Sequence, residues 1–113
     1  MPAADLVHSW LRSNLSVPEV TGAWLYGSFV GPNSDVGDID VLVRYRAGWS
    51  GSASKLRGQV ERLFGETFSI PLHAIFLSET EFEDEAPFIQ VLLAQSSEIS
   101  FLRRPNSRVR GDA

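Results

Sequence analysis

The chain has 113 residues, of which 43% are hydrophobic and 21% are charged, a balance typical of one soluble globular domain. It contains no cysteine, which excludes a disulfide framework and a thiolate metal site. It also shows no apolar run of membrane-spanning length and no secretory signal pattern at its N-terminus, so we expect a cytoplasmic protein with no membrane partner.

The net charge of −4 is unevenly distributed along the chain. Residues 103–113 hold four arginines and one aspartate, so residues 1–102 carry a net charge of −7. An acidic body repels a phosphate backbone, and nucleic acid is therefore not an expected ligand without a partner. We expect a single domain over residues 1–102, followed by a flexible basic tail over residues 103–113.

The first two elements in chain order are a helix and a strand. Apolar residues at helical spacing predict an amphipathic helix over Ala3–Asn14. His8 lies beside the apolar stripe of this helix with no second ligand at a metal spacing, so we interpret it as a surface or hydrogen-bonded histidine. Val20–Tyr26 then forms the first predicted strand, with Trp24 and Tyr26 on one face. We expect both aromatic side chains to pack on the sheet, with nucleobase stacking by Tyr26 as the alternative.

A glycine and a serine follow this strand directly. Gly27 permits a sharp turn and a close approach of backbone to a ligand, and Ser28 adds a hydroxyl and its own N–H. If a helix begins at this turn, its N-terminal N–H groups form a site for an anion such as phosphate. The simpler alternative is a strand-to-loop turn in which Ser28 acts as a cap.

Two aspartates open the second predicted strand, which covers Asp38–Tyr45. Because side chains alternate along a strand, Asp38 and Asp40 share one face. Two carboxylates at this spacing can reach one metal ion or a close pair of ions, and oxygen ligands suit Mg²⁺. The alternative is an acidic turn, which fits less well because aspartate is depleted in strands and an apolar run follows. Arg44 shares the same face, where it could approach a phosphate, pair with an acid or lie in solvent.

Taken together, Gly27-Ser28, a spacer of nine residues and Asp38-Ile39-Asp40 before an apolar run resemble the signature of the minimal polymerase-β-type nucleotidyltransferases. The resemblance implies an α/β (α+β) nucleotidyltransferase fold, with a mixed β-sheet and helices packed against it. It also implies that Gly27, Ser28, Asp38 and Asp40 bind a nucleoside triphosphate, expected to be ATP. In this family the two aspartates bind Mg²⁺, as one or two ions, and activate an acceptor hydroxyl.

The resemblance further implies a reaction and a partner. The reaction is Mg²⁺-dependent transfer of AMP from ATP to an acceptor hydroxyl. Small members of the family work beside a helical protein, including the HEPN toxins of toxin–antitoxin pairs, so a small helical partner is expected. The competing hypothesis is a catalytically inactive domain that binds a nucleotide or a protein. It draws support from residues 29–37, which lack the arginine that many relatives carry there.

The middle of the chain bears on the same choice. We predict a flexible loop over Gly48–Ser52, a helix over Ser54–Phe64 that stops at Gly65, and a third strand over Phe68–Leu77. Active relatives place a third carboxylate on a strand in this region, and the nearest equivalent here is His73. An imidazole can serve as a base but is a poor Mg²⁺ ligand. His73 is therefore a third catalytic candidate beside Asp38 and Asp40, and its presence also supports the inactive alternative.

The last predicted elements are short. Ser78 and Glu81 form a capping-box pattern that predicts a helix directly after Ser78. Glu98–Leu102 is predicted to be a short edge strand. Between them, Pro87 suits the start of a second helical piece, whose inward residues we expect to be Phe88, Ile89, Leu92 and Leu93.

Overall fold

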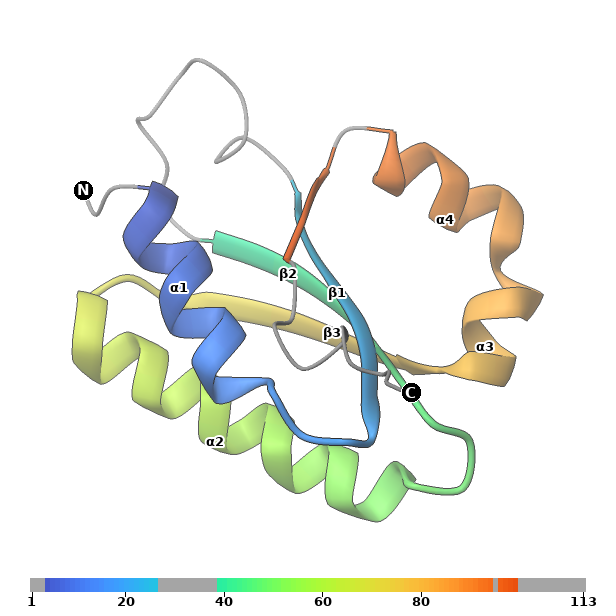
Figure 1. Cartoon of the computed structure of the whole chain (residues 1–113), viewed down its shortest axis with the longest axis horizontal. Coiled ribbons are helices and arrows are strands. Elements are labelled where there is room, and N and C mark those ends of the chain that lie inside the picture. Colours follow the sequence, from blue (N-terminus) through green and yellow to red (C-terminus); the bar gives the residue numbers. More distant parts are fainter. Residues whose placement is uncertain (1–3, 27–38, 95, 100–113) are drawn as a thin grey trace, which may run out of the picture.

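The computed structural model describes residues 4–26, 39–94 and 96–99 (Figure 1). The predicted basic tail, 103–113, lies outside these residues. None of the described helices has the length and apolar character that a membrane span requires. The elements in chain order are α1 (Ala4–Asn14), β1 (Val20–Tyr26), β2 (Ile39–Tyr45), α2 (Ser50–Phe68), β3 (Leu72–Ser78), α3 (Glu79–Asp84), α4 (Ala86–Leu93) and β4 (Ser97–Glu98).

The strands form one mixed sheet in the order β3-β2-β1-β4. β1 pairs antiparallel with β2 and with β4, whereas β2 and β3 are parallel and are joined through α2. A parallel pair needs a crossover of this kind, because the chain must return to the end of the sheet at which β2 began. The predicted α/β fold with a mixed sheet and packed helices is therefore confirmed.

The main core lies between one face of the sheet and the helices α1 and α2 (Figure 1). The strands send alternate side chains to this face, as expected for a sheet with two different environments. Burying each large aliphatic side chain stabilises the fold by about 1.5–3 kcal/mol. The fully or nearly fully buried members of this cluster include Val7, Leu11, Leu15, Ala23, Leu25, Ile39, Val41, Val43, Val60, Phe64, Leu72 and Ala74.

The helices α3 and α4 lie against the opposite face of the sheet (Figure 1). Leu42 of β2 and Ile89 of α4 are buried outside the main cluster, each about 1% exposed. At one end of this face the Trp24 ring stacks on Phe82 of α3, with centroids 5.4 Å apart. α3 packs against β2 and β3 and α4 packs against β1, and the candidate site lies on the same face near the start of β2 and β3.

The predicted capping box starts α3. The Glu81 backbone N–H donates to the Ser78 hydroxyl at 3.1 Å, and the Ser78 backbone N–H donates to Glu81 Oε1 at 2.8 Å. These bonds satisfy two backbone N–H groups at the turn from β3 into the helix. Local chemistry therefore sets the residue at which α3 begins.

The bounds predicted around α2 are wrong in three places. The helix begins at Ser50 rather than Ser54, and it continues through Gly65 to end at Phe68. The residue that caps it, Ser69, adopts a left-handed φ of 59°. β3 consequently begins at Leu72 and not at residue 68. The added turn places Phe68 against Trp10, at a centroid distance of 6.1 Å. Packing of this kind outweighs the roughly 1 kcal/mol that a glycine costs in a helix.

The predicted inward face of α4 is also partly wrong. Ile89 is buried as predicted, but Phe88 is 57% exposed. The helix is apolar on most sides, so its sequence pattern does not specify which side faces the sheet. Its docking on β1 decides the orientation.

Candidate functional site

Asp40 and His73 lie side by side near the start of β2 and β3. The parallel register of β2 and β3 pairs the two residues directly. Their chain neighbours Ile39, Val41 and Leu72 are buried in the main core, so alternation directs both polar side chains to the opposite face. His73 Nδ1 is 3.6 Å from Asp40 Oδ1. The sheet thus brings together two of the three predicted catalytic side chains, 33 positions apart in the sequence.

Tyr26 completes a row of three side chains across the strands. The antiparallel register pairs Tyr26 of β1 with Asp40, on the side away from His73. Burial, and to a lesser extent the Asp40 carboxylate, raises the pKa of the Tyr26 hydroxyl above its ordinary value of 10.0. The sequence analysis gave Tyr26 a packing role, although its place directly before Gly27 was a signal that it borders the site.

The side chains of this row differ in their exposure to solvent. The His73 side chain is 63% exposed, and that of Asp40 is 29% exposed. An imidazole on the sheet edge is reachable by a second molecule, whereas the carboxylate lies deeper between its neighbours.

The other predicted site residues fall in one segment. Gly27, Ser28 and Asp38 lie within residues 27–38, outside the described residues. They are joined covalently to the row, because Gly27 follows Tyr26 and Asp38 precedes Ile39. Their predicted roles in phosphate and metal binding stay predictions. Within the part of the chain that the structure describes, no group of three or more carboxylate, imidazole or thiolate side chains could hold a metal ion.

The donor chemistry of the row nevertheless fits a divalent cation. Asp40 supplies a carboxylate and His73 an imidazole from paired strands, and both are groups that divalent cations bind in proteins. A magnesium or manganese ion keeps several sites for water and phosphate oxygens.

Arg44, at the other end of the same face of β2, has a structural role. Its guanidinium donates from Nε to the Thr21 hydroxyl and from Nη2 to the Thr21 carbonyl, both at 2.8 Å. Its Cζ lies 5.3 Å from the Trp24 ring centroid and 5.1 Å from that of Phe82. Four residues along a strand separate it from Asp40 by about 13 Å. Of the alternatives left open by the sequence, neither phosphate approach at the row nor a solvated strand end describes Arg44.

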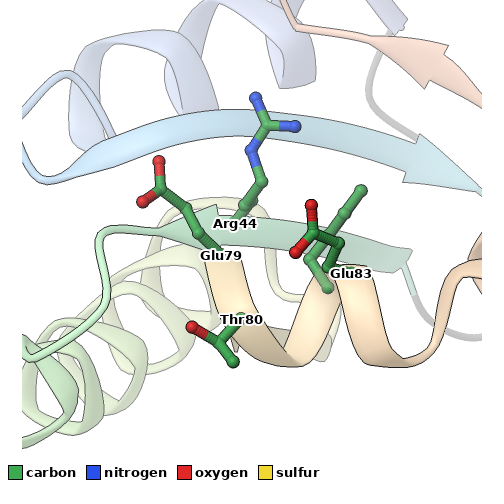
Figure 2. A pocket seen from close by; sticks show the side chains of 5 residues that line it. Arg44, Glu79, Thr80 and Glu83 are labelled. Atoms are coloured by element: carbon green, nitrogen blue, oxygen red, sulfur yellow. The ribbon is translucent and has the colours of Figure 1, made fainter.

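A surface cavity of about 410 Å³ adjoins this arginine. It is lined by Arg44, Thr80 and Phe82 together with two glutamates of α3, Glu79 and Glu83. Figure 2 shows the two glutamates on either side of Arg44. The arginine is already engaged by Thr21 and two aromatic rings, so we assign the catalytic candidates to the Asp40 end of the face.

The second histidine of the chain lies apart from this site. His8 Nε2 is 3.1 Å from the Ser97 hydroxyl, which joins α1 to β4. Burial lowers the pKa of His8 below its ordinary value of 6.5. Of the two interpretations of His8, a surface or a hydrogen-bonded histidine, this contact agrees with the second.

The outer edge of β3 holds a contact that the sequence analysis missed. The Ala74 backbone N–H donates to Glu61 Oε2 of α2 at 3.0 Å. Because β3 is an edge strand, this N–H has no neighbouring strand to bond to. Glu61 therefore secures the residue directly after His73. Only the docking of α2 beside β3 reveals it, since nothing in the local sequence links the two residues.

Comparison with known proteins identifies the fold through structure rather than sequence. No protein-family model matches the chain, and no curated protein matches it. A solved tyrosine-to-alanine variant of the toxin–antitoxin MntA–HpeT matches with a TM-score of 0.60 at 14% identity, over 92% of this chain and 76% of that one. A second MntA–HpeT variant, with two aspartates two positions apart changed to glutamate, has a TM-score of 0.60 at 12% identity, over 91% and 77% of the chains. A toxin–antitoxin with AMP-PNP has a TM-score of 0.58 at 17% identity, over 88% and 74%. At these identities the likeness establishes the nucleotidyltransferase fold.

Proposed function

We propose that the chain is a nucleotidyltransferase that moves AMP from ATP to an acceptor hydroxyl, as one half of a toxin–antitoxin-like pair. The observation that carries this proposal is the Asp40–His73 pair, placed across two parallel strands of a nucleotidyltransferase fold. The similarity to a solved toxin–antitoxin with AMP-PNP supports a nucleotide as the ligand. The two aspartates substituted in the double variant are two positions apart in their own chain, as Asp38 and Asp40 are in this one.

Each site residue has a proposed role. Gly27 and Ser28 would hold the triphosphate, and Asp38 and Asp40 would hold a divalent ion, for which Mg²⁺ is the first candidate. The ion supplies charge stabilisation at the phosphate and lowers the pKa of an oxygen bound to it. His73 would act in the position of a third acid, either as a ligand or as the base that accepts the proton of the acceptor hydroxyl.

The second candidate function is an inactive domain that binds a nucleotide or protein partner. The observation that favours it is the imidazole of His73 where a third carboxylate is expected, because an imidazole brings no negative charge. Nucleotide binding is compatible with both candidates, so binding alone does not distinguish them. Transfer of the nucleotide does.

The test compares two labels of ATP. The full chain is incubated with ATP labelled at the α-phosphate or at the γ-phosphate, with divalent metal and a lysate that contains candidate acceptors. We expect transfer of the α-label alone, because nucleotidyl transfer releases the γ-phosphate within pyrophosphate. Asp38→Asn and Asp40→Asn should each reduce transfer on the order of 100-fold or more.

The matched control is Asp84→Asn, which makes the same charge change at an exposed residue at the end of α3. It should transfer the label as the natural chain does. Metal-dependent nucleotide binding without transfer would refute the enzyme and favour the inactive domain. Loss of transfer in Asp84→Asn as well would refute the assignment of Asp38 and Asp40.

A further inference from the structure

We propose that the outer face of α4, which carries Phe88 and Val91, is the docking surface for a partner helix with an apolar stripe and lysines or arginines beside it. This surface is called the α4 face below. The inference deepens the proposed function and rests on it for the existence of a protein partner. It involves neither Asp40 nor His73, so it does not depend on nucleotide transfer.

The α4 face is apolar although it does not face the sheet. Within Ala86–Leu93 only Gln90 has a polar side chain. Ile89 is 1% exposed in a helix that contacts β1, whereas Phe88 and Val91 are 57% and 61% exposed. Side chains three positions apart on a helix are neighbours, so these two form one apolar patch. Among the described residues four large hydrophobic side chains are exposed, and two of the four lie here. Such grouping is typical of a protein–protein contact.

The chain around the α4 face is acidic throughout. Residues 79–99 contain five glutamates, one aspartate and no lysine, arginine or histidine, a net charge of −6. Within the described part of the chain, no lysine or arginine forms an ion pair with any of these acids. Glu79 and Glu83 lie on either side of Arg44 (Figure 2), but its guanidinium donates to Thr21 instead. A positively charged partner is therefore attracted to this side of the molecule. The attraction depends on the sum of six charges, so the loss of any single one changes it little.

Charge also argues against two other occupants of the α4 face. A symmetric dimer places the same surface of both copies in contact, which would bring two segments of net charge −6 together. The chain's own residues 103–113 have a net charge of +3, but Val109 is their one large hydrophobic residue. They offer little apolar surface with which to cover both Phe88 and Val91. A separate partner that is both basic and apolar fits the surface better.

The form of the α4 face favours a helix as the partner element. Phe88 and Val91 stand about one helical turn apart, and helices pack by placing such ridges into the grooves of a second helix at about 8–10 Å. An aromatic anchor such as Phe88 would insert between apolar side chains spaced i, i+3 and i+4 on the partner. Basic residues beside that apolar stripe would then lie near the acids that precede α4.

The test uses two synthetic helical peptides of about 18 residues that have leucine along one face. One peptide has lysine beside the leucines, and the other has glutamate at each lysine position. Each is added to the full chain without nucleotide, and binding is followed by fluorescence anisotropy of the labelled peptide and by the amide NMR signals of the chain. We expect the basic peptide alone to bind, with the largest shifts at Phe88 and Val91 and with an affinity that falls as salt rises.

Substitutions then test whether binding occurs at the α4 face. Phe88→Gln combined with Val91→Gln should weaken binding of the basic peptide on the order of 10-fold or more. Leu6→Gln is the matched control, because Leu6 of α1 is 60% exposed, and it should change the affinity by less than about twofold. If circular dichroism shows that the double variant does not fold, Val91→Gln alone gives the same test, since glutamine favours a helix more than valine does.

Several results would overturn the inference. They are no binding of the basic peptide, equal binding of both peptides, or unchanged binding in the double variant. A dimer of the natural chain that dissociates in the double variant would assign the α4 face to a second copy. If replacing the four arginines of residues 103–113 by glutamine shifts the Phe88 and Val91 signals without peptide, the chain's own tail occupies the face. Each of these results leaves nucleotide transfer standing, because the assay contains no nucleotide.

Discussion

Gly22 is expected to be a position where a single methyl group destabilises the sheet. A Cβ placed there would lie 2.6 Å from Trp24 Cη2, 3.2 Å from Trp24 Cζ3 and 3.1 Å from Arg44 Nη2. The Trp24 ring is stacked on Phe82 and is contacted by the Arg44 guanidinium, so it cannot move aside without disturbing both. Gly22→Ala should therefore break up the cluster formed by Trp24, Arg44 and Phe82.

The size of this destabilisation is the sum of two unfavourable contributions and one favourable contribution to the free energy of unfolding. Overpacking of this kind costs about 1–3 kcal/mol, and a lost aromatic pair adds about 0.5–1.5 kcal/mol. The smaller conformational freedom of alanine in the unfolded chain offsets about 0.4–1 kcal/mol. We expect Gly22→Ala to lower the free energy of unfolding by about 0.5–4 kcal/mol, which corresponds to a fall in Tm of about 4 °C or more for each kcal/mol in a domain of this size.

The assay is urea denaturation followed by circular dichroism and by tryptophan fluorescence, with Gly58→Ala as the control. Gly58 lies within α2, and a Cβ there meets nothing within 4 Å. The control should gain about 0.5–1 kcal/mol, because alanine is the better helix former. The reasoning is refuted if Gly22→Ala is as stable as the natural chain, or if both variants change in the same direction.

Three further predictions concern the capping box, the sheet edge and pH. Ser78→Ala should lower the free energy of unfolding by about 1 kcal/mol through loss of the cap of α3, and Ser78→Asp should recover most of it; equal stability of all three chains in denaturation would contradict this. Glu61→Ala should cost about 1–3 kcal/mol, because it removes the acceptor of the Ala74 N–H, whereas Glu61→Gln keeps an acceptor and should cost less; hydrogen exchange at Ala74 should speed up in the alanine variant alone. Burial lowers the pKa of His8 below 6.5 in the folded chain, so the unfolded chain binds the proton more readily. The contribution of neutral His8 to the free energy of unfolding is therefore complete above pH 6.5 and is lost as the pH falls through the lower pKa of the folded chain. Denaturation of the natural chain and of His8→Gln across this range should show the weaker pH dependence in the variant, and parallel curves would contradict the assignment.

The sequence alone predicted much of the fold because its signals are local. The first strand ends where predicted, because Val20–Tyr26 is a mostly apolar run and Gly27 follows it directly. The start of α3 follows from two hydrogen bonds within four residues. By contrast, the bounds of α2 depend on the packing of Phe68 against α1, which no window of sequence contains.

For the candidate site, the sequence determined which residues carry the chemistry: aspartates at alternate positions at the start of one strand, and a histidine where another strand lacks an acid. Only the tertiary structure decided that Asp40 and His73 become neighbours, because a parallel register joins strands separated by a whole helix. It also decided that Arg44 turns toward Thr21 and two aromatic rings, since the energy of a long side chain depends on partners that come from other strands and helices. The sequence specifies which side chains are present, whereas the distances between them depend on how the whole sheet and its helices pack.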